Sequence, residues 1–204
     1  MDDTRPLTPK GRDTRRRLMA EAKRLFGERG YSRVRITDIT EAAGISGGAF
    51  YRYFTDRHEL MIELLRELTD EAFDFVRVPW DGDDPRASVL RSTQLYLRFY
   101  DANRELFGLL VELAQTDDEV RRIWAGSRQA FYGRIAHALR RGIESGVVRT
   151  GIDIEVAAEM LGSMSEFYAF QRFVLCDGVI KDVPIEVAGE TLVDTWISGV
   201  SKRA

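Results

Sequence analysis

The chain has little of the residue types that build covalent or metal-bound sites. Cys176 is the only cysteine among 204 residues, and His58 and His137 are the only histidines. One cysteine excludes an intrachain disulfide, and these side chains are too few for a Cys/His metal cluster. The sequence also lacks a Ser/His/Asp or Cys/His arrangement, a phosphate loop and a dinucleotide-binding motif. We therefore expect no bound metal, no cofactor and no enzymatic activity.

Proline and long apolar runs are also scarce. The five prolines leave residues 10–78 and 86–183 free of the strongest helix breaker. No apolar run approaches the roughly 18 residues of a membrane-spanning helix, and the first residues are charged where a signal peptide would be apolar. The sequence therefore predicts a cytoplasmic protein in which long helices are allowed almost everywhere.

Positive charge is concentrated near the N-terminus. Residues 1–60 hold 13 Lys and Arg against 9 Asp and Glu, whereas the whole chain has a net charge of -3. A basic segment on an acidic body is typical of a protein that touches a polyanion with one end. Lys10, Arg12 and Arg15–Arg17 form a candidate N-terminal arm for nucleic acid, and a solvated tail with the first turn of a helix is the alternative.

Apolar spacing predicts helices along the whole chain. Leu18, Ala22, Leu25 and Phe26 repeat as one face of a helix that ends before Gly30. Strict alternation, which would indicate strands, is missing. Further helices are predicted near residues 86–102, 104–114, 118–145, 153–175 and 185–201. The fold class is therefore expected to be all-α.

Residues 37–54 have the pattern of a helix-turn-helix. Thr37–Ala43 suits a short helix that Gly44 can end with a left-handed residue, and Ser46 can cap a second helix running to Tyr53 or Phe54. Two short helices joined by such a turn form the motif. On the second helix, Phe50 and Phe54 would face inward, whereas Gly48 and Arg52 would face outward.

The run from Arg15 to Leu60 resembles the DNA-binding domain of TetR-family transcriptional regulators. The matching positions are Phe26, Gly30-Tyr31, Ile39, Ala42–Ser46, Gly48, Phe50-Tyr51, Tyr53-Phe54 and Glu59-Leu60. The resemblance implies a DNA-binding domain over residues 1–57, with the helix-turn-helix at about 37–54 after a basic arm. It also implies an all-helical ligand-binding and dimerisation domain over residues 58–204, which matches the family only in architecture.

The resemblance further implies which residues contact DNA. Tyr51, Tyr53 and Ser46 would reach phosphates, Arg52 a phosphate or a guanine edge, and Ala49 a thymine methyl. Arg57 stands where the family usually has a lysine. The candidate DNA-contacting residues are Arg35, Thr37, Ser46, Gly47, Gly48, Ala49, Tyr51, Arg52, Tyr53 and Arg57.

Two positions depart from the family pattern. Arg35 replaces the threonine that commonly caps the first helix of the motif, so either Thr37 is the cap or Arg35 itself contacts DNA. Position 47 often carries a long side chain in the family and is glycine here. The absence of side chains at Gly47 and Gly48 would let backbone amides come close to phosphates or bases, at a cost in helix stability of about 1 kcal/mol for each glycine.

The second part of the chain is rich in aromatic residues, which can line an apolar pocket or only fill the core. The candidate ligand-binding residues are Tyr96, Tyr100, Phe107, Trp124, Arg128, Phe131, Tyr132, Phe167 and Gln171. The last two helices carry stripes that include Leu161 with Met164 and Leu192 with Trp196. By similarity to the family these stripes would form a homodimer interface, and packing within the subunit is the alternative.

The resulting hypothesis is a ligand-responsive transcriptional regulator, most simply a repressor. It would bind a palindromic operator as a dimer and be released by a small hydrophobic or aromatic effector. The alternatives are a DNA-binding protein without an effector and a helical-domain enzyme.

Overall fold

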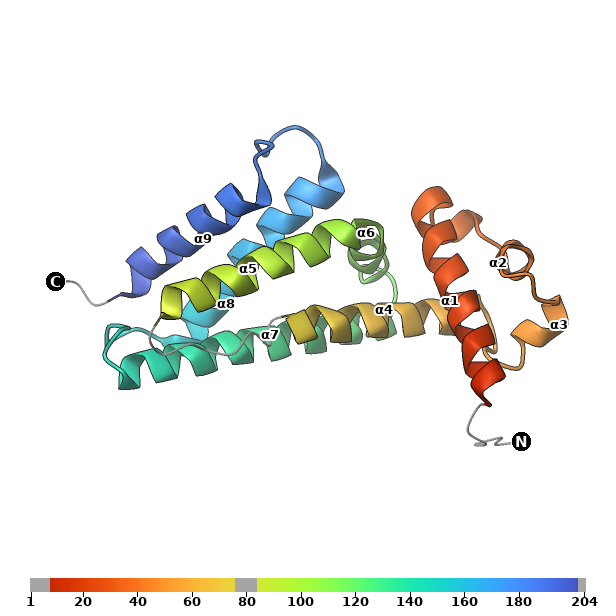
Figure 1. Cartoon of the computed structure of the whole chain (residues 1–204), viewed down its shortest axis with the longest axis horizontal. Helices are drawn as coiled ribbons and strands as arrows, with labels where there is room; N and C mark the ends of the chain where they lie inside the picture. The colour runs from red at the N-terminus through yellow and green to blue at the C-terminus, as the bar shows by residue number, and fades with distance from the viewer. Residues whose placement is uncertain (1–7, 76–83, 202–204) are drawn as a thin grey trace. The chain divides into compact units, whose positions relative to one another are not determined.

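The computed structural model describes residues 8–75 and 84–201, and these residues are helical apart from turns and one isolated β-bridge. The all-α fold class is thereby confirmed (Figure 1). The chain divides into an N-terminal unit up to Glu67 and a C-terminal unit from Leu68. The sequence instead places the domain boundary between residues 57 and 58. The predicted boundary stays a prediction, because the contacts within each unit do not show which segment can fold independently.

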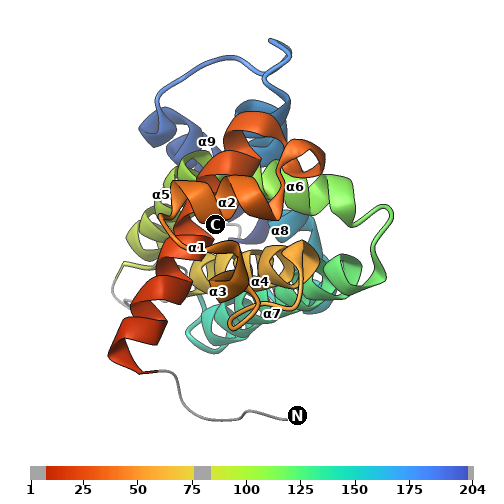
Figure 2. The same cartoon turned by 90° about the vertical axis from the view of Figure 1, so that its right-hand side faces the viewer.

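The N-terminal unit is built from short helices around a longer one. Its elements are α1 (Pro9–Arg29), the 3-10 turn η1 (Tyr31–Arg33), α2 (Ile36–Ala42), α3 (Gly47–Phe50) and the start of α4 (Arg57–Phe75). The first three α-helices are labelled in Figure 2. Thr8 begins α1, because its hydroxyl accepts a hydrogen bond from the Gly11 amide at 3.1 Å and Pro9 needs no amide partner.

One apolar core unites these helices. The predicted stripe of α1 is confirmed, since Leu18, Ala22, Leu25 and Phe26 are all buried. The core also takes side chains from the later helices: Ile39, Phe50, Phe54 and Leu60. Each such side chain stabilises the fold by about 1.5–3 kcal/mol on burial. Short helices can therefore persist here because they share a core.

The C-terminal unit contains the long helices. They are α5 (Pro85–Ala102), α6 (Arg104–Leu113), α7 (Asp118–Glu144), α8 (Ile154–Phe170), the π-helical turn η2 (Gln171–Leu175) and α9 (Ile185–Val200). Asp84, Asp117 and Asp153 precede three of them, and each carboxylate accepts a hydrogen bond from a first-turn amide. The predicted bounds agree to within about a turn, except that helix 153–175 becomes π-helical at Gln171.

Close approach of backbones fixes the helix pairs of this unit. α7 packs along α8, and α5 packs along α9. At the first pair, a Cβ added at Gly162 would lie 2.3 Å from the ring of Tyr132. At the second, a Cβ added at Gly189 would lie 2.8 Å from Cγ of Gln94. Glycine is therefore required at both crossings for steric reasons.

Substitution of Gly162 should destabilise the protein. We expect Gly162→Ala to lower the free energy of unfolding by about 1–3 kcal/mol, because the ring of Tyr132 must move. Gly126→Ala on α7 is the matched control, since nothing lies within 4 Å of its added Cβ. The control should gain up to about 1 kcal/mol through helix propensity. Urea unfolding measures both, and an unchanged or raised stability of Gly162→Ala would contradict the packing argument.

Candidate nucleic-acid interface and ligand pocket

A glycine turn joins α2 to α3. Gly44 has a φ of +63°, a conformation that side chains disfavour, which confirms the left-handed residue predicted there. The Ala43 amide donates to the carbonyl of Ile39, and the Ile45 amide donates to the carbonyl of Thr40, each at 2.9 Å. These bonds fix the direction in which the chain enters α3.

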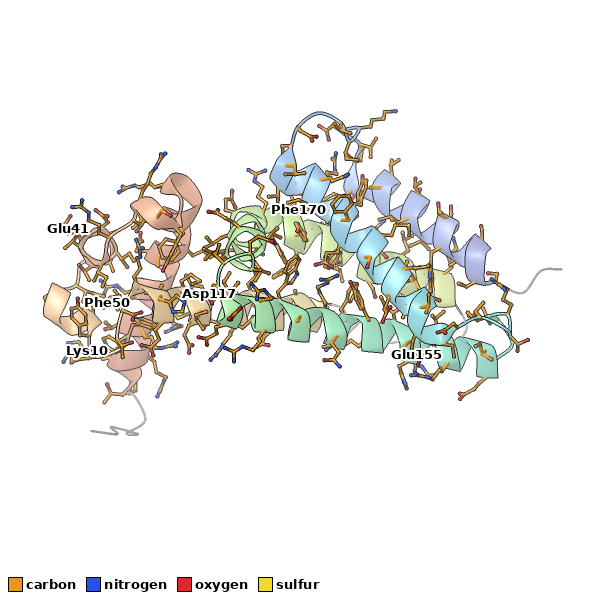
Figure 3. The ribbon with its side chains drawn as sticks, turned by 180° about the vertical axis from the view of Figure 1, so that it is seen from behind. Lys10, Glu41, Phe50, Asp117, Glu155 and Phe170 are labelled. Carbon is orange, nitrogen blue, oxygen red and sulfur yellow. The ribbon has the colours of Figure 1, made fainter. Side chains whose placement is uncertain are left out.

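The side chains around α3 divide into a buried and an exposed set, as the sequence predicts. Phe50 and Phe54 are buried, and Phe50 lies on the inner side of α3 (Figure 3). Gly48 and Arg52 are exposed, and Tyr51 is 61% exposed. The Arg52 guanidinium lies 6.0 Å from the centre of the Tyr53 ring. Tyrosine and arginine groups thus share the outward surface.

Helix α3 is shorter than the sequence predicts. It ends at Phe50 rather than at Tyr53 or Phe54, and the chain continues as a turn in which Tyr53 and Phe54 amides both donate to the Phe50 carbonyl. The shortening lies at the end away from Gly47 and Gly48, since both glycines are part of the helix. The expectation that the Ser46 side chain caps α3 is also wrong, since it makes no capping hydrogen bond.

Thr37, the cap predicted for α2, does not cap the helix. Arg35 occupies the capping position, and its backbone amide donates to the Asp38 carboxylate at 2.7 Å. The cap is thus completed by Asp38, which sequence reasoning missed although an acid three residues after the cap is its usual signal. Thr37 lies inside the first turn, and the side chains of Arg35 and Thr37 are exposed.

Several basic residues of this unit direct their guanidinium groups to other groups of the protein. The Arg15 guanidinium donates to the Glu63 carboxylate at 2.6 Å, and the Arg17 guanidinium donates to the Ala43 carbonyl. The Arg57 guanidinium donates to the Tyr31 carbonyl at 3.1 Å and to the Val34 carbonyl. We call Arg15, Arg17 and Arg57 the inward arginines. Their bonds serve the fold, so the DNA contact predicted for Arg57 stays a prediction.

The residues predicted as a basic arm lie on α1. Lys10 is in its first turn (Figure 3), and Arg12 and Arg16 are exposed farther along the helix. Residues 1–7 lie outside the described residues. A helix carries this positive charge, where the sequence predicts an arm.

Loss of the Arg57 contacts should destabilise the N-terminal unit. The guanidinium also lies 4.3 Å from the centre of the Tyr31 ring, so Arg57→Met removes hydrogen bonds and a cation–π contact together. We expect a loss of about 1–3 kcal/mol in the free energy of unfolding. Arg33→Met, at an exposed position of η1, should change it by less than about 0.5 kcal/mol. Urea unfolding followed by circular dichroism tests this, and equal effects of the two variants would refute the role of Arg57.

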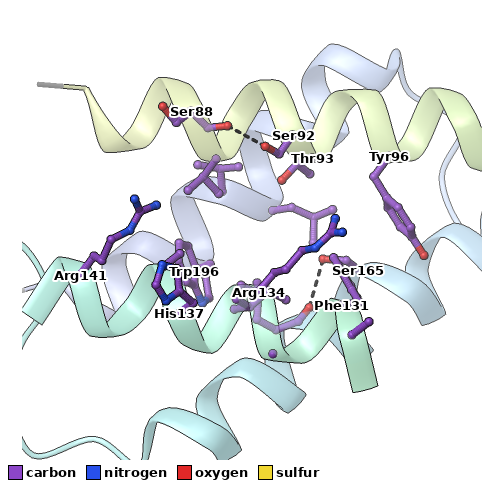
Figure 4. A pocket seen from close by; sticks show the side chains of 18 residues that line it. Ser88, Ser92, Thr93, Tyr96, Phe131, Arg134, His137, Arg141, Ser165 and Trp196 are labelled. Atoms are coloured by element: carbon purple, nitrogen blue, oxygen red, sulfur yellow. Dashed lines mark hydrogen bonds between the residues drawn. The ribbon is translucent and has the colours of Figure 1, made fainter. Parts of the chain in front are cut away.

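A cavity of about 420 Å³ lies among α5, α7, α8 and α9 of the C-terminal unit (Figure 4). Its size is typical of small-molecule sites. It is lined by Ser88, Val89, Ser92, Thr93, Tyr96, Ala130, Phe131, Gly133, Arg134, Ile135, His137, Ala138, Arg141, Leu161, Ser165, Leu192, Val193 and Trp196. Apolar walls with a few polar groups suit an organic ligand rather than an ion.

One end of the cavity is closed by stacked aromatic rings. Tyr96 of α5 and Phe131 of α7 have ring centres 5.6 Å apart and nearly parallel planes. Burial, and secondarily the charge of Glu166, raises the pKa of Tyr96 well above its ordinary value. The Tyr96 hydroxyl therefore stays protonated at physiological pH.

Of the residues predicted to bind ligand, Tyr96 and Phe131 line this cavity. Tyr100 and Phe107 are instead buried and stack on each other with centres 3.9 Å apart. Phe167 is 61% exposed, and Gln171 begins η2. These four residues lie outside the cavity lining.

Trp124, Arg128 and Tyr132 also lie outside the lining and form a polar cluster between α7 and α8. Their common partner is Glu166, whose carboxylate accepts a hydrogen bond from the Trp124 indole at 2.9 Å and lies 3.2 Å from the Arg128 guanidinium. The Tyr132 hydroxyl accepts a hydrogen bond from Arg128 at 3.2 Å. Arg128 also lies over the Trp124 ring. The cluster joins two helices rather than facing the cavity.

Sequence reasoning missed most of the lining, including Arg134, Arg141, Leu161 and Trp196. A signal was present on α7, where Arg134, His137 and Arg141 recur at helical spacing on one face. The spacing alone does not show that this face borders a cavity.

The stripes predicted for dimerisation are partly used inside the subunit. Leu161, Leu192 and Trp196 line the cavity, and Ala188 is buried. The exposed apolar stripe of α8 is a neighbouring one, formed by Val156, Met160, Met164 and Phe167. We call these four residues the α8 stripe. Met164 belongs to both the predicted and the exposed stripe, whereas the predicted members Leu161, Leu192 and Trp196 pack within the subunit, which was the alternative.

Among residues 8–75 and 84–201, no group of three His, Cys, Asp or Glu side chains is placed to hold a metal ion. In the same residues, no helix combines the length and apolar character needed to cross a bilayer.

Comparison with known proteins agrees with the helix-turn-helix. Residues 18–64 match the model of the bacterial regulatory proteins of the tetR family. The chain is 28% identical over 156 residues to the transcriptional repressor KstR2 of Rhodococcus jostii, covering 72% of this chain and 74% of the relative. It is 24% identical over 199 residues to the regulator EthR of Mycolicibacterium smegmatis, covering 96% of this chain and 90% of the relative.

A solved structure has the same fold over nearly the whole chain. It is a transcriptional regulator of Saccharomonospora viridis in complex with choline, with a TM-score of 0.76 and 22% identity, covering 94% of this chain and 100% of that chain. Sequence motif, fold and relatives agree, and residues 18–64 of this chain form a domain similar to the DNA-binding domain of the tetR family of bacterial regulatory proteins.

Proposed function

We propose that this regulator is a repressor that binds a palindromic operator as a homodimer in the cytoplasm and leaves it when an effector occupies the cavity. The main support is the outward surface of α3, where Tyr51 and Arg52 stand exposed beside two glycines. Repression is the printed role of the relative KstR2. The cavity supplies a place for the effector.

The operator contacts follow from the chemistry of the exposed groups. Arg52 can donate two hydrogen bonds to a guanine edge or bind a phosphate, and the Tyr51 hydroxyl can donate to a phosphate. Nothing lies within 4 Å of a Cβ added at Gly47 or Gly48, so the protein itself does not require glycine there. Close approach of DNA to the backbone gives both glycines a reason.

Dimerisation is supported by the α8 stripe. Met160 is 69% exposed and Phe167 is 61% exposed, and apolar side chains repeated on one helix face mark an interaction surface. Val187 of α9 is exposed as well. A four-helix interface of α8 and α9 with their copies would cover these groups and present two recognition surfaces to the two halves of a palindrome.

Release by the effector requires only a difference in affinity. In the dimer, the two copies of the α3 surface can be spaced to fit the operator or spaced so that they do not fit it. The effector must bind the second arrangement more tightly than the first. A difference of about 1–3 kcal/mol would lower operator affinity roughly 5- to 150-fold. The Saccharomonospora viridis protein, which holds choline, shows that this fold can carry a small molecule.

Operator binding is tested with DNA that flanks the gene. Arg52→Ala with Tyr51→Phe should weaken specific binding by about 2–4 kcal/mol, since two base or phosphate contacts are lost. Arg33→Met is a control for general loss of positive charge. Fluorescence anisotropy at fixed salt measures the affinities. A footprint without two-fold symmetry, or unchanged affinity of the double variant, would refute the proposed binding mode.

The same assay tests the glycines. Gly48→Ala should raise stability by about 0.5–1 kcal/mol because alanine favours the helix. If close approach is the reason for glycine, the same change should also weaken operator binding. Raised stability with unchanged affinity would exclude close approach.

The oligomeric state tests the α8 stripe. Met160→Glu with Phe167→Glu should yield monomers, since charges would be buried in an apolar interface. Glu159→Gln, at an exposed α8 position beside the stripe, should stay dimeric. Analytical ultracentrifugation separates the two states, and a dimeric Met160→Glu, Phe167→Glu variant would place the interface elsewhere.

A further inference from the structure

The charged residues that line the cavity are all potential cations. Arg134, His137 and Arg141 belong to the lining, which contains no Asp or Glu. This contrasts with the rest of the unit, because residues 68–204 hold 16 Lys and Arg against 22 Asp and Glu. A cavity with basic side chains in an acidic body is a local reversal of charge. Concave sites concentrate such a field.

The two arginines come from one helix face and point the same way. Arg134 and Arg141 lie seven residues apart on α7, about two turns, and both side chains extend from α7 towards α5 (Figure 4). We call this pair, with His137 between them, the basic edge. Each guanidinium has five N–H donors, so a partner within the protein leaves donors for a ligand.

The walls beyond the basic edge are apolar. Helices α8 and α9 supply apolar side chains to the cavity wall. These are Leu161, Leu192, Val193 and Trp196. On α5, the hydroxyl of Ser92 donates to the Ser88 carbonyl at 3.0 Å (dashed in Figure 4), which leaves its oxygen as an acceptor. The charged donors of the lining therefore lie on α7, and α9 adds one neutral donor, because the Trp196 indole N–H is buried without a hydrogen-bond partner among the described residues.

A carboxylate near the other end of the cavity is already paired. Glu166 acts electrostatically on Tyr96, but its oxygens bond the Trp124 indole and the Arg128 guanidinium. Because Arg128 balances the charge of Glu166, the positive side chains of the lining on α7 are not offset by this carboxylate.

We propose that the effector is an anionic amphiphile, whose acidic group binds Arg134 and Arg141 and whose apolar body lies against Leu161, Val193 and Trp196. The proposal rests on the cavity being the effector site. It narrows the ligand class, since an apolar molecule without an acidic group offers no acceptor to the remaining N–H donors of Arg134 and Arg141. Carboxylates and phosphate esters share the required chemistry.

Three probes with one alkyl chain test the charge requirement in the full-length protein. Isothermal titration calorimetry compares decanoate, decanol and decyltrimethylammonium at fixed salt and below their micelle concentrations. Decanoate should bind at least about ten-fold more tightly than decanol, as expected for charge-assisted hydrogen bonds. Decyltrimethylammonium should bind most weakly. Decyl phosphate in place of decanoate separates the two kinds of acidic group.

Variants locate the effect. Arg134→Gln with Arg141→Gln should bring the decanoate-to-decanol ratio close to one while decanol binding is kept. Arg140→Gln is the matched control, because Arg140 lies on the same helix, bonds Glu155 and does not line the cavity. Equal affinity of the wild type for the three probes, retention of the preference in the double variant, or no binding of decanoate would overturn the proposal.

A cavity-filling variant separates this proposal from the one it rests on. Ala138→Trp places a large ring in the lining, and circular dichroism establishes that it folds. Suppose that the wild type binds the three probes equally well and that Ala138→Trp binds none of them. The cavity is then a ligand site, and only the proposed ligand class is wrong. If Ala138→Trp leaves binding unchanged, the cavity is not the site.

Discussion

The exposed surface formed by Tyr51 and Arg52 depends on α3, a helix too short to be stable by itself. Four residues form α3, two of them glycine, and isolated helices need about 12–15 residues even with good propensity. Its position therefore comes from burial of Phe50 and Phe54 and from the turn at Gly44. Rigid presentation of Tyr51 and Arg52 is a property of the whole N-terminal unit rather than of α3.

Positive charge has two uses in that unit. The excess of Lys and Arg over residues 1–60 indicates a polyanion partner, yet the inward arginines direct their guanidinium groups to carbonyls and a carboxylate. Arginine suits this work because its planar fork can satisfy several acceptors at once. A count of charges along a sequence therefore overstates the charge that a surface offers to DNA.

Prediction from sequence succeeded where local chemistry decides the outcome. The stripe of α1, the left-handed Gly44 and the inward Phe50 follow from spacing and backbone preference. The motif pattern predicts α3 to run to Tyr53 or Phe54, whereas the helix ends at Phe50 and the Tyr53 and Phe54 amides share the Phe50 carbonyl. Local reasoning also placed the cap on a hydroxyl, whereas Asp38 supplies it.

The cavity was beyond local reasoning because four helices build it. Tyr96 and Phe131 were identified as aromatic, but so were Tyr100 and Phe107, which stack within the core instead. Which aromatic ring borders empty space depends on how α5, α7, α8 and α9 meet. The same holds for the α8 stripe, since neighbouring faces of α8 carry similar apolar residues.

The open space beside Gly47 and Gly48 has a consequence for how this regulator can change over evolutionary time. Neither position has a positive φ, and neither would bring a new Cβ within 4 Å of another group. A β-carbon can therefore be added at the leading end of α3 without a clash, and most residues would favour the helix more than glycine does. If this end of α3 meets the operator as proposed, single substitutions can change its contacts at little cost in folding.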